Sequence, residues 1–493
     1  MSAALAEINS ATKINNNLQP LVARTRVNDS IHNHSFLNEV DSYLDTYPNT
    51  KHIDIFLYDL NGYLRGKRID ISCLKSLDKG CYLPLSIYAM SLDGNVVEET
   101  GLGKFVGEPD YLCVPVLGSL HPNPIDPHIN AQLLLTMKEN NVQDCRYEPR
   151  NILNKLLNRL HLLDYFPCIA AELEFYLQPL SQESQKSAIP KQCFDLNPHA
   201  DIQAVLDEIE TIAQIQGIHI TGIVSESSSD QYEINLPHGT DILKLCDQIL
   251  MLKRSIKQVA NKHGFKANFL AKPDLHKAGS GMHFHMSLLD ANKHNIFSCS
   301  ERDFAKPLLN VISGLIHFMP DSMAILAPNF NSYRRFKLGQ HVSLEANWGW
   351  YNRNVALRIP CADSENQRIE YRVAGADCNP YLAVAIILMG TLHGLTHISA
   401  IPKSVNQSKQ IGEHYFLPTE QMDALKRFKA NHWMSEYLNQ DFVELWCTVK
   451  QAEYQHVLSQ ITAIEKIGIF KSSHILMSDS KRLLNALIGT AFI

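Results

Sequence analysis

The amino-acid sequence predicts an α+β protein with at least two domains. Its 493 residues, 45% of them hydrophobic, exceed the roughly 250–300 residues at which a single hydrophobic core stops growing. An Asn-Gly pair between two extended runs predicts a β-hairpin near residue 61. Beyond about residue 146, helical patterns alternate with short strands. We therefore expect a small α+β domain over residues 36–145, followed by a larger domain.

The N-terminal elements follow from local sequence. Residues 1–35 are rich in Asn, Ser and Thr and show little periodicity, which is typical of a mobile arm. Residues 53–58 (IDIFLY) are strand-like, the pair Asn61-Gly62 follows, and residues 63–69 are again extended. The hairpin that these runs predict would form the centre of the small domain.

The larger part of the chain is predicted to combine helices with short strands. Leucines at helical spacing indicate a helix over residues 151–163, and the apolar run over residues 381–389 indicates a buried helix. That run is far shorter than the ~20 residues that span a bilayer, so we expect no membrane partner. The other expected elements are amphipathic helices over 200–216 and 241–263, a strand over 169–177, strand-rich stretches over 269–289 and 355–373, and a loop over 181–195.

Composition excludes several classes of function. The net charge is −6 and the pI is about 6.4, so nucleic acid and anionic membranes are not expected as partners. The 11 cysteines include no Cys-x-x-Cys pair, which indicates reduced thiols and a cytoplasmic protein. The first residues contain no sustained apolar region, so we expect no signal peptide.

Four short strands repeat one arrangement of polar side chains. Residues two apart on a strand share a face, so each set should project on one side of a sheet. The intervening Leu, Tyr, Met, Phe and Ile residues suit the opposite, buried side. The sets are Glu172 and Glu174, Gln231 and Glu233, His283 and His285, and the triplet Arg368, Glu370 and Arg372.

A divalent cation would explain this cluster, because neighbouring carboxylates repel one another and cost several kcal/mol to desolvate. Carboxylates with an occasional imidazole favour Mg²⁺ or Mn²⁺ over structural zinc. Guanidinium groups bind phosphate and carboxylate oxygens. Metals and arginines in one cavity predict a phosphoryl-transfer site; the alternative is that each pattern marks a solvated face. The arginines are Arg335, Arg353, Arg358, Arg368 and Arg372.

Several segments resemble the glutamine synthetase superfamily and stand in that family's order. They are residues 171–176 (AELEFY), 271–287 (AKPDLHKAGSGMHFHMS), 331–335 (NSYRR), 352–360 (NRNVALRIP) and 368–380 (RIEYRVAGADCNP). The resemblance extends from about residue 50 to residue 467. Within the superfamily the chain is most similar to the gamma-glutamylpolyamine (gamma-glutamylputrescine) synthetases, through stretches such as residues 64–69 (LRGKRI) and 94–103 (GNVVEETGLG).

The resemblance implies a glutamine synthetase-like architecture. Residues 36–145 would form a β-grasp domain, and residues 146–467 a catalytic domain with a curved antiparallel sheet and flanking helices. Residues 468–493 would be a C-terminal extension. The resemblance also implies a homo-oligomer, commonly a dodecamer of two stacked hexameric rings, with active sites between neighbouring subunits.

The same resemblance implies a role for each residue that matches a family motif. One metal ion would be held by Glu174, Glu226 and Glu233, and another by Glu172, His283 and Glu370. The residues facing ATP would be His285, Ser287, Arg353, Arg358 and Arg368. Glutamate would be held by Gly279, Arg335, Arg353 and Arg372, of which Arg353 and Arg372 would be catalytic. The glutamate γ-carboxylate would attack the γ-phosphate of ATP, and an amine would then displace phosphate from the acyl phosphate.

The chain departs from the ammonia-using members at the amine site. His341 stands where those enzymes carry an acidic residue, and residues 83–87 (LPLSI) do not match their ammonium-binding Asp-Gly-Ser-Ser stretch. Both changes favour a larger amine, with putrescine as the default. Such an amine has a pKa of about 10 and needs a base; His341 is a candidate by position, and an oxygen at the metal or on phosphate would serve as well.

A second departure is Ser229-Asp230, where relatives carry Pro-Gly before the glutamine. A residue other than glycine there predicts strain, if the loop needs a positive φ. Three competing functions stay open: a glutamine synthetase using ammonia, a ligase for another amine such as ethanolamine, and a non-catalytic structural relative. The intact glutamates and histidines argue against the last of these.

Overall fold

The structure is a computed structural model that describes residues 36–140, 142–180, 193–298, 304–337, 342–397, 400–406, 416–462 and 465. The expected arm over residues 1–35, His341 and the extension over residues 468–493 therefore lie outside the described residues. Most of the loop expected over 181–195 also lies outside them.

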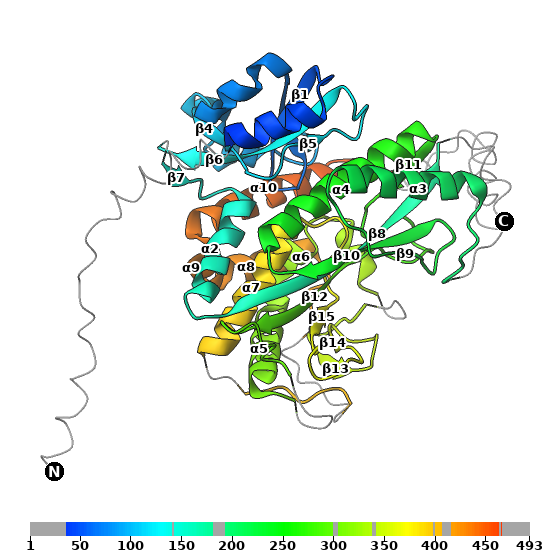
Figure 1. Ribbon diagram of the computed structural model, residues 1–493. Helices are drawn as coiled ribbons and strands as arrows, with labels where there is room; N and C mark the ends of the chain where they lie inside the picture. The colour runs from blue at the N-terminus through cyan, green and yellow to red at the C-terminus, as the bar shows by residue number, and fades with distance from the viewer. Residues whose placement is uncertain are drawn as a thin grey trace, which may run out of the picture.

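The N-terminal part is a seven-stranded sheet in the order β2-β1-β6-β4-β3, with β5 and β7 paired to β6. The pairing of β1 with β6 is parallel, and the other pairings are antiparallel. A helix over residues 36–46 lies at the top of Figure 1 with this sheet, and its Phe36 and Val40 are buried in the core. The strands are β1 His52–Tyr58, β2 Leu64–Asp70, β3 Cys81–Pro84, β4 Asp110–Pro115, β5 His121–Pro122, β6 Asn130–Glu139 and β7 Gln143–Asp144.

The predicted hairpin is confirmed as the antiparallel pair β1 and β2, in the register Tyr58↔Leu64. Its loop is longer than the Asn-Gly pair alone suggests, because the Asp59 carboxylate accepts hydrogen bonds from the backbone N–H groups of Asn61 and Tyr63, both at 2.9 Å. Gly62 has a φ of 75°, which glycine adopts without steric cost.

The C-terminal part is built on an eight-stranded sheet in the order β13-β14-β15-β12-β8-β10-β9, with β11 paired to β8. All pairings are antiparallel except that of β13 with β14. The strands are β8 Phe166–Pro179, β9 Gly222–Ser225, β10 Gln231–Gly239, β11 Phe265–Asn268, β12 Met282–Leu289, β13 Trp348–Trp350, β14 Leu357–Ile359 and β15 Ile369–Tyr371. The strand-rich expectation for 269–289 was too long, since residues 269–280 form no strand.

Helices pack against this sheet and against one another (Figure 1). They are α2 Pro149–His161, α3 Ala200–Ile215, α4 Ile242–Lys262, α5 Lys306–Phe318, α6 Met323–Leu326, α7 Pro380–Thr396, α8 Gln421–Ala430, α9 His432–Leu438 and α10 Gln440–Leu458. Proline at the first turn starts α2, and the Asp241 carboxylate caps α4 by accepting from Lys244 N–H at 3.1 Å. The buried helix predicted from residues 381–389 is α7, which is apolar on all sides.

No single helix in the described ranges is long and apolar enough to cross a bilayer. The pair Lys306–Phe318 and Pro320–Leu326 passes such a test together, by length and composition, with a bend of 53°. Most residues of this pair are buried in the protein core.

Polar side chains fasten the hairpin loop to the C-terminal part. Asn379 donates to the carbonyl oxygens of Asp59 and Leu60, each at 3.2 Å. The ammonium of the fully buried Lys450 lies 2.5 Å from Asn61 Oδ1 and 2.9 Å from a carboxylate oxygen of Glu453. The two sheets therefore belong to one packed unit, in which the N-terminal hairpin faces the helices of the larger part.

Candidate active site

Strand register brings the polar sets of four strands into neighbouring rows. On β8, Glu172 lies opposite Asn235 of β10 and His283 of β12. Glu174 lies opposite Glu233 of β10. A third row joins His285 of β12 to Glu370 of β15 and Arg358 of β14. The period of two within each strand and the antiparallel pairing between strands thus place these side chains together on one face.

These side chains line a cavity of about 650 Å³. Glu174, Glu233, His283, His285 and Glu370 are all buried, with 1–8% of their surface exposed. Glu226, in the turn after β9, completes the acidic wall of the cavity. Burying five carboxylates in one cavity is unfavourable unless cations compensate them.

Part of that compensation comes from imidazoles and guanidinium groups of the chain itself. The Glu172 carboxylate lies 3.1 Å from His283 Nδ1 and 2.8 Å from His285 Nε2. Glu370 accepts from Arg358 Nη1 at 2.5 Å and also from Arg372 Nη1. The sequence had predicted Arg368 and Arg372 on either side of Glu370, whereas the second partner is Arg358, because β14 pairs with β15 at this position.

Glu226 and Glu233 have no ion-pair partner among the described residues, and their pKa values show the difference. Burial, with the added repulsion of Glu172 and Glu174, raises the pKa of Glu233 to about 9. Burial and the charge of Glu174 also raise the pKa of Glu226. Burial alone would raise the pKa of Glu172 and of Glu370 as well, but the nearby imidazoles and guanidinium groups reverse this and hold both values below the ordinary range.

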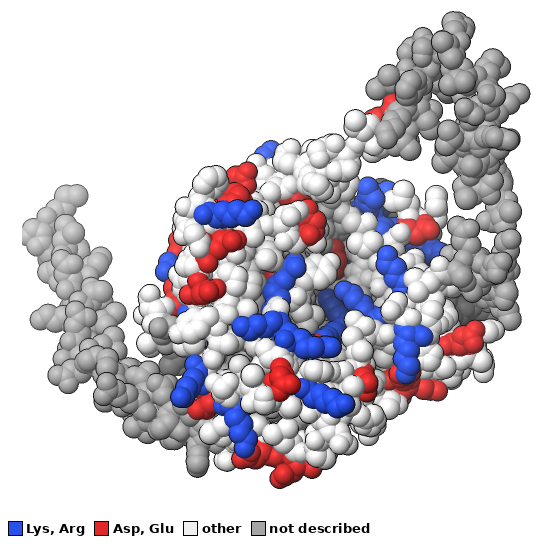
Figure 2. Space-filling model, turned by 90° about the horizontal axis from the view of Figure 1, so that it is seen from above, with Lys and Arg blue, Asp and Glu red and all other residues white. Residues whose placement is uncertain are grey.

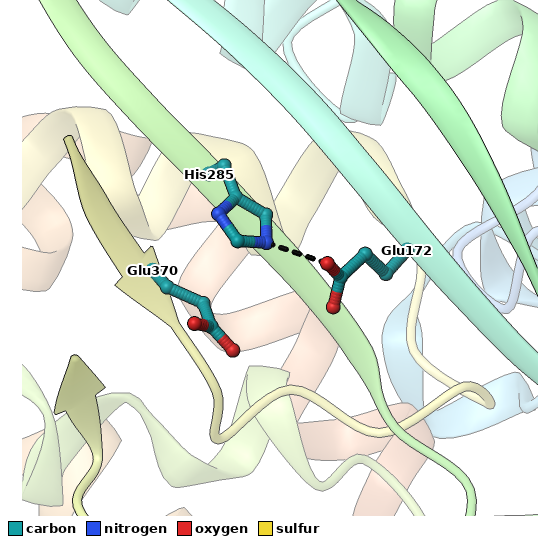
Figure 3. Close-up of side chains that lie close together, drawn as sticks. All are labelled: Glu172, His285 and Glu370. Atoms are coloured by element: carbon teal, nitrogen blue, oxygen red, sulfur yellow. Dashed lines mark hydrogen bonds and ion pairs between the residues drawn. The ribbon is translucent and has the colours of Figure 1, made fainter. Parts of the chain in front are cut away.

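Among the described residues, two groups of side chains could hold a metal ion. In each group the ligand atoms lie within 4.8 Å of one another: Glu172, His285 and Glu370 form one (Figure 3), and Glu172, Glu233 and His283 form the other. Carboxylate oxygens with one imidazole nitrogen suit Mg²⁺ or Mn²⁺. The sharing of Glu172 by both groups would place two ions close together, as two-metal phosphoryl-transfer sites require.

Buried polar atoms without a protein partner also point to a ligand. In the described part of the chain, Gln231 Oε1, Asn235 Oδ1 and the Nε atoms of Arg335, Arg358 and Arg372 have no hydrogen-bond partner. All five residues line the cavity. Buried polar groups normally have partners, so these donors and acceptors fit a polar ligand that carries several oxygen atoms.

Comparison with known proteins decides the family. The family described as "Glutamine synthetase, catalytic domain" matches residues 146–467. "Gamma-glutamylputrescine synthetase PuuA" of Escherichia coli (strain K12) is 44% identical over 451 residues, which cover 89% of this chain and 96% of that protein. The chain belongs to the glutamine synthetase family. A "Glutamate--isopropylamine ligase" of a Pseudomonas species is 30% identical over 353 residues, covering 68% of this chain and 76% of the ligase.

Solved structures confirm the fold of this glutamine synthetase family member. The GmaS/ADP complex superposes with a TM-score of 0.75 at 23% identity, covering 88% of this chain and 99% of that chain. A glutamine synthase homologue superposes with a TM-score of 0.71 at 19% identity, covering 85% and 98%. The α+β, glutamine synthetase-like fold predicted from the sequence is therefore confirmed.

The other site residues that family motifs had suggested mostly line the same cavity. Arg353 lies in the exposed turn between β13 and β14, Arg368 precedes β15 and reaches His285 Nδ1 at 3.4 Å, and both line the cavity wall. Ser287 sits further along β12, opposite Cys168, and is not one of the cavity-lining residues. His341 lies outside the described residues, so its role as a base stays a prediction.

Gly279 and Arg335 also line the cavity. Arg335 is buried and donates to the carbonyl oxygens of Val373 at 2.8 Å and Ala374 at 3.0 Å. A Cβ atom on Gly279 would lie 2.8 Å from Arg335 Cγ and 2.8 Å from Ala271 O. Only glycine leaves room for this arginine, so the two residues act as a pair.

Sequence reasoning placed Gln231 and Asn235 as polar neighbours of Glu233 on one strand face but assigned them no role. The Gln231 amide donates to Glu174 Oε2 at 3.3 Å and to Gly279 O at 2.9 Å, and thereby links two walls of the cavity. Asn235 lies directly opposite Glu172. Each is two residues from Glu233 on β10, and this spacing is the sequence signal that could have indicated a place in the cavity.

The strain predicted at Ser229-Asp230 is not found. Neither residue has a positive φ, and the Asp230 carboxylate instead accepts from Lys277 Nζ at 2.7 Å. The turn is closed by hydrogen bonds between the backbones of Glu226 and Gln231 at 3.0 Å and of Gln231 and Ser228 at 3.1 Å. The sequence expectation was wrong because this turn follows a path that does not need glycine.

Proposed function

We propose that this protein uses ATP to join the γ-carboxylate of glutamate to an amine, through a γ-glutamyl phosphate intermediate. One observation carries the proposal: five carboxylates, two imidazoles and five arginines from separate segments line a single cavity of about 650 Å³. Carboxylates that hold divalent cations beside guanidinium groups that hold oxyanions are the arrangement that phosphoryl transfer needs. Membership of the glutamine synthetase family supports the same reaction.

The proposed roles divide the residues of the cavity by ligand. Mg²⁺ or Mn²⁺, two or more per site, would neutralise phosphate and carboxylate charge, held by Glu172, Glu174, Glu226, Glu233, His283 and Glu370, with His285 within reach of one ion. Gly279, Arg335, Arg353 and Arg372 would position glutamate. Arg353, Arg358 and Arg368 would stabilise the negative charge that develops on the transferred phosphoryl group.

The acceptor that we propose is a polyamine such as putrescine. The E. coli relative that covers nearly the whole chain is a gamma-glutamylputrescine synthetase, and the Pseudomonas relative is named for another alkylamine. The position of His341, where ammonia-using members carry an acid, supports the same choice. Such an amine must lose a proton before it attacks, and His341 is the base that we propose.

Assembly, domain division and location complete the proposal. The two sheets support a β-grasp domain over residues 36–145 and a catalytic domain over 146–467. The family resemblance supports a dodecamer of two stacked hexameric rings, which mass photometry of the intact protein would test. The free thiols of the described cysteines fit a reducing, cytoplasmic compartment.

The decisive experiment is phosphate release from ATP with glutamate and Mg²⁺, comparing putrescine, spermidine, ethanolamine and ammonium as acceptors. We expect the highest kcat/KM with putrescine. Preference for ammonium would favour a glutamine synthetase, and preference for ethanolamine would favour a ligase for that amine. Absence of release with every acceptor would leave a structural relative without catalysis.

A further inference from the structure

A second and larger pocket lies where the N-terminal hairpin meets the C-terminal part, away from the proposed active site. Its volume is about 960 Å³. The hairpin loop contributes Tyr63 and Arg65, helix α4 contributes Lys253, Arg254 and Lys257, and strand β11 contributes Lys266. Neither the family match nor the reaction proposed above uses these residues.

The lining of this pocket is strongly basic, although the chain as a whole carries a net charge of −6. Six cationic side chains line it, against two carboxylates, Asp93 and Asp377. Figure 2 shows Lys and Arg side chains around a hollow on the face seen from above. Such a concentration of like charge raises the free energy of the empty pocket and attracts anions.

Some of these cations are neutralised by partners outside the pocket. Arg65 pairs with Asp59 at 2.8 Å and Arg254 with Asp54 at 2.6 Å. The ammonium of Lys253 donates to the carbonyl oxygens of Ala376 at 2.7 Å and Cys378 at 3.4 Å. These three side chains therefore have their hydrogen-bonding capacity at least partly committed.

The other three cations have no carboxylate partner among the described residues: Lys257, Lys266 and Arg334. All three are exposed to the pocket. Lys257 Nζ lies 5.5 Å from the centre of the Tyr63 ring and 5.6 Å from that of Phe269, and the Arg334 guanidinium lies 5.1 Å from the Phe330 ring. Burial by the surrounding protein lowers the pKa of Lys257.

Helix geometry adds to the repulsion. Lys253 and Lys257 are four residues apart on α4, so they share one face of the helix. Like charges at this spacing destabilise a helix, by roughly 0.2–0.5 kcal/mol per pair in isolated helices. Desolvation also lowers the pKa of Lys253 to about 8, and the charge of Lys257 adds to this effect. An anion bound at Lys257 would offset the charge of Lys257 and so reduce this repulsion.

We propose that this pocket binds a small multivalent anion, either a phosphate ester or a polycarboxylate, held by Lys257, Lys266 and Arg334. The volume lies within the ~300–1,000 Å³ of small-molecule sites. Aromatic rings beside the cations favour a ligand with a planar or apolar portion next to its charged groups.

Residues adjacent in the chain line the two pockets, which gives this anion a route to influence the reaction. Arg334 lines the second pocket, and its neighbour Arg335 lines the first. Similarly, Ala376 and Asp377 line the second pocket, and Arg372 lines the first. Asp377 accepts from Ser332 at 2.6 Å and ties the two segments together. Binding should therefore change the affinity for glutamate, which Arg335 and Arg372 are proposed to hold.

The test is titration calorimetry on the intact protein, with EDTA and at low salt, using inorganic pyrophosphate and citrate as separate probes. We compare the wild-type chain with Lys257→Gln, Lys266→Gln and Lys262→Gln. Lys262 is the matched control, since it lies on the same helix but pairs with Glu208 at 2.7 Å outside the pocket. A parallel Arg353→Ala variant identifies anions that bind in the active-site cavity instead.

The proposal requires that one or both probes bind at least tenfold more weakly to Lys257→Gln and Lys266→Gln, while Lys262→Gln and Arg353→Ala retain that binding. The probe that binds shows whether phosphate or carboxylate chemistry is preferred. Binding that Arg353→Ala removes and Lys257→Gln leaves intact would overturn the proposal, as would no binding of either probe at millimolar concentration. These readings need no turnover, so they are independent of whether the proposed ligase reaction is correct.

Discussion

The two pockets differ in how far their charges are balanced, and the elements that build them explain why. The active-site cavity is lined mainly from β-strands, whose period of two projects carboxylates, imidazoles and arginines in mixed rows. The second pocket draws its cations largely from one helix face and nearby loops, with few acids opposite them. Charges are balanced or nearly balanced in the first pocket and left unbalanced in the second. Removing one charged side chain from each pocket tests this difference, because the change in activity or stability shows whether a neighbouring charge had balanced it.

The largest effect is expected from Glu233→Gln in the active-site cavity. This change removes a negative charge that we expect a divalent cation to neutralise, and it keeps the size of the side chain. Phosphate release from ATP at saturating Mg²⁺ should fall by roughly 10²–10³-fold, the loss typical of removing one electrostatic group from an active site. The control is Glu436→Gln, which makes the same change at an exposed position. Activity of Glu233→Gln within twofold of wild type would contradict the metal assignment.

The adjacent residues Arg334 and Arg335 sharpen the comparison, because each faces a different pocket. Arg335→Ala should lower the free energy of unfolding by about 2–4 kcal/mol, since it removes the donor to the buried carbonyl oxygen of Val373 and one of the two donors to that of Ala374. Arg334→Ala removes an exposed side chain and should change it by less than about 0.5 kcal/mol. Thermal melting of both variants measures the difference. Equal changes in melting temperature for the two variants would show that the hydrogen bonds of Arg335 do not stabilise the fold.

The sequence predicted the strand faces of the active site better than it predicted the pairing between strands. Alternation placed Glu172 with Glu174 and His283 with His285, because the period of two is a local property. Which strands become neighbours depends on pairing between distant segments, so the contact of Glu370 with Arg358 could not be predicted from the strand that carries Glu370. Arg358 belongs to β14, which pairs with the strand of Glu370.

The second pocket could not have been predicted from the sequence. Lys257 and Lys266 stand among other polar residues in a helix and a strand, where a solvated surface is the ordinary interpretation. Arg334 belongs to the same short motif as the active-site residue Arg335, so nothing in the sequence indicated that Arg334 lines a different pocket. The pocket exists only because the hairpin loop near Gly62 packs beside α4 and β11, and packing between separate parts of the chain leaves no short motif.

The stabilisation of the fold by a divalent cation should depend on pH, and Glu233 determines the direction of this dependence. Its pKa is raised from 4.5 to about 9 in the folded chain, so without metal the folded state loses stability as pH rises through this range. Glu172 and Glu370, whose pKa values are lowered, contribute stability that is lost only in acid. A bound divalent cation removes the Glu233 penalty, so its stabilising effect should grow as pH rises.

We therefore expect Mg²⁺, compared with EDTA, to raise the melting temperature by roughly 2–4 °C more near pH 8.5 than near pH 6, which corresponds to about 2–4 kcal/mol for a protein of this size. NaCl at equal ionic strength is the control for screening. A Mg²⁺ effect that is equal at both pH values, or larger near pH 6, would contradict the electrostatic account of the carboxylate cluster.

The smallest effect, and the one with the most informative sign, is expected on α4. Lys257 has no carboxylate partner in the described part of the chain and its pKa is lowered, so its charge costs stability when the pocket holds no anion. Solvent screens an exposed charge, so Lys257→Gln should stabilise the ligand-free protein by at most about 0.5 kcal/mol. Lys262→Gln should act in the opposite direction by a similar amount, because it breaks the surface pair with Glu208. Thermal melting in EDTA without added anion measures both. If Lys257→Gln instead destabilises the chain, Lys257 has a structural partner, and the second pocket is a packed junction between the hairpin and α4 with no unbalanced charge for a ligand to neutralise.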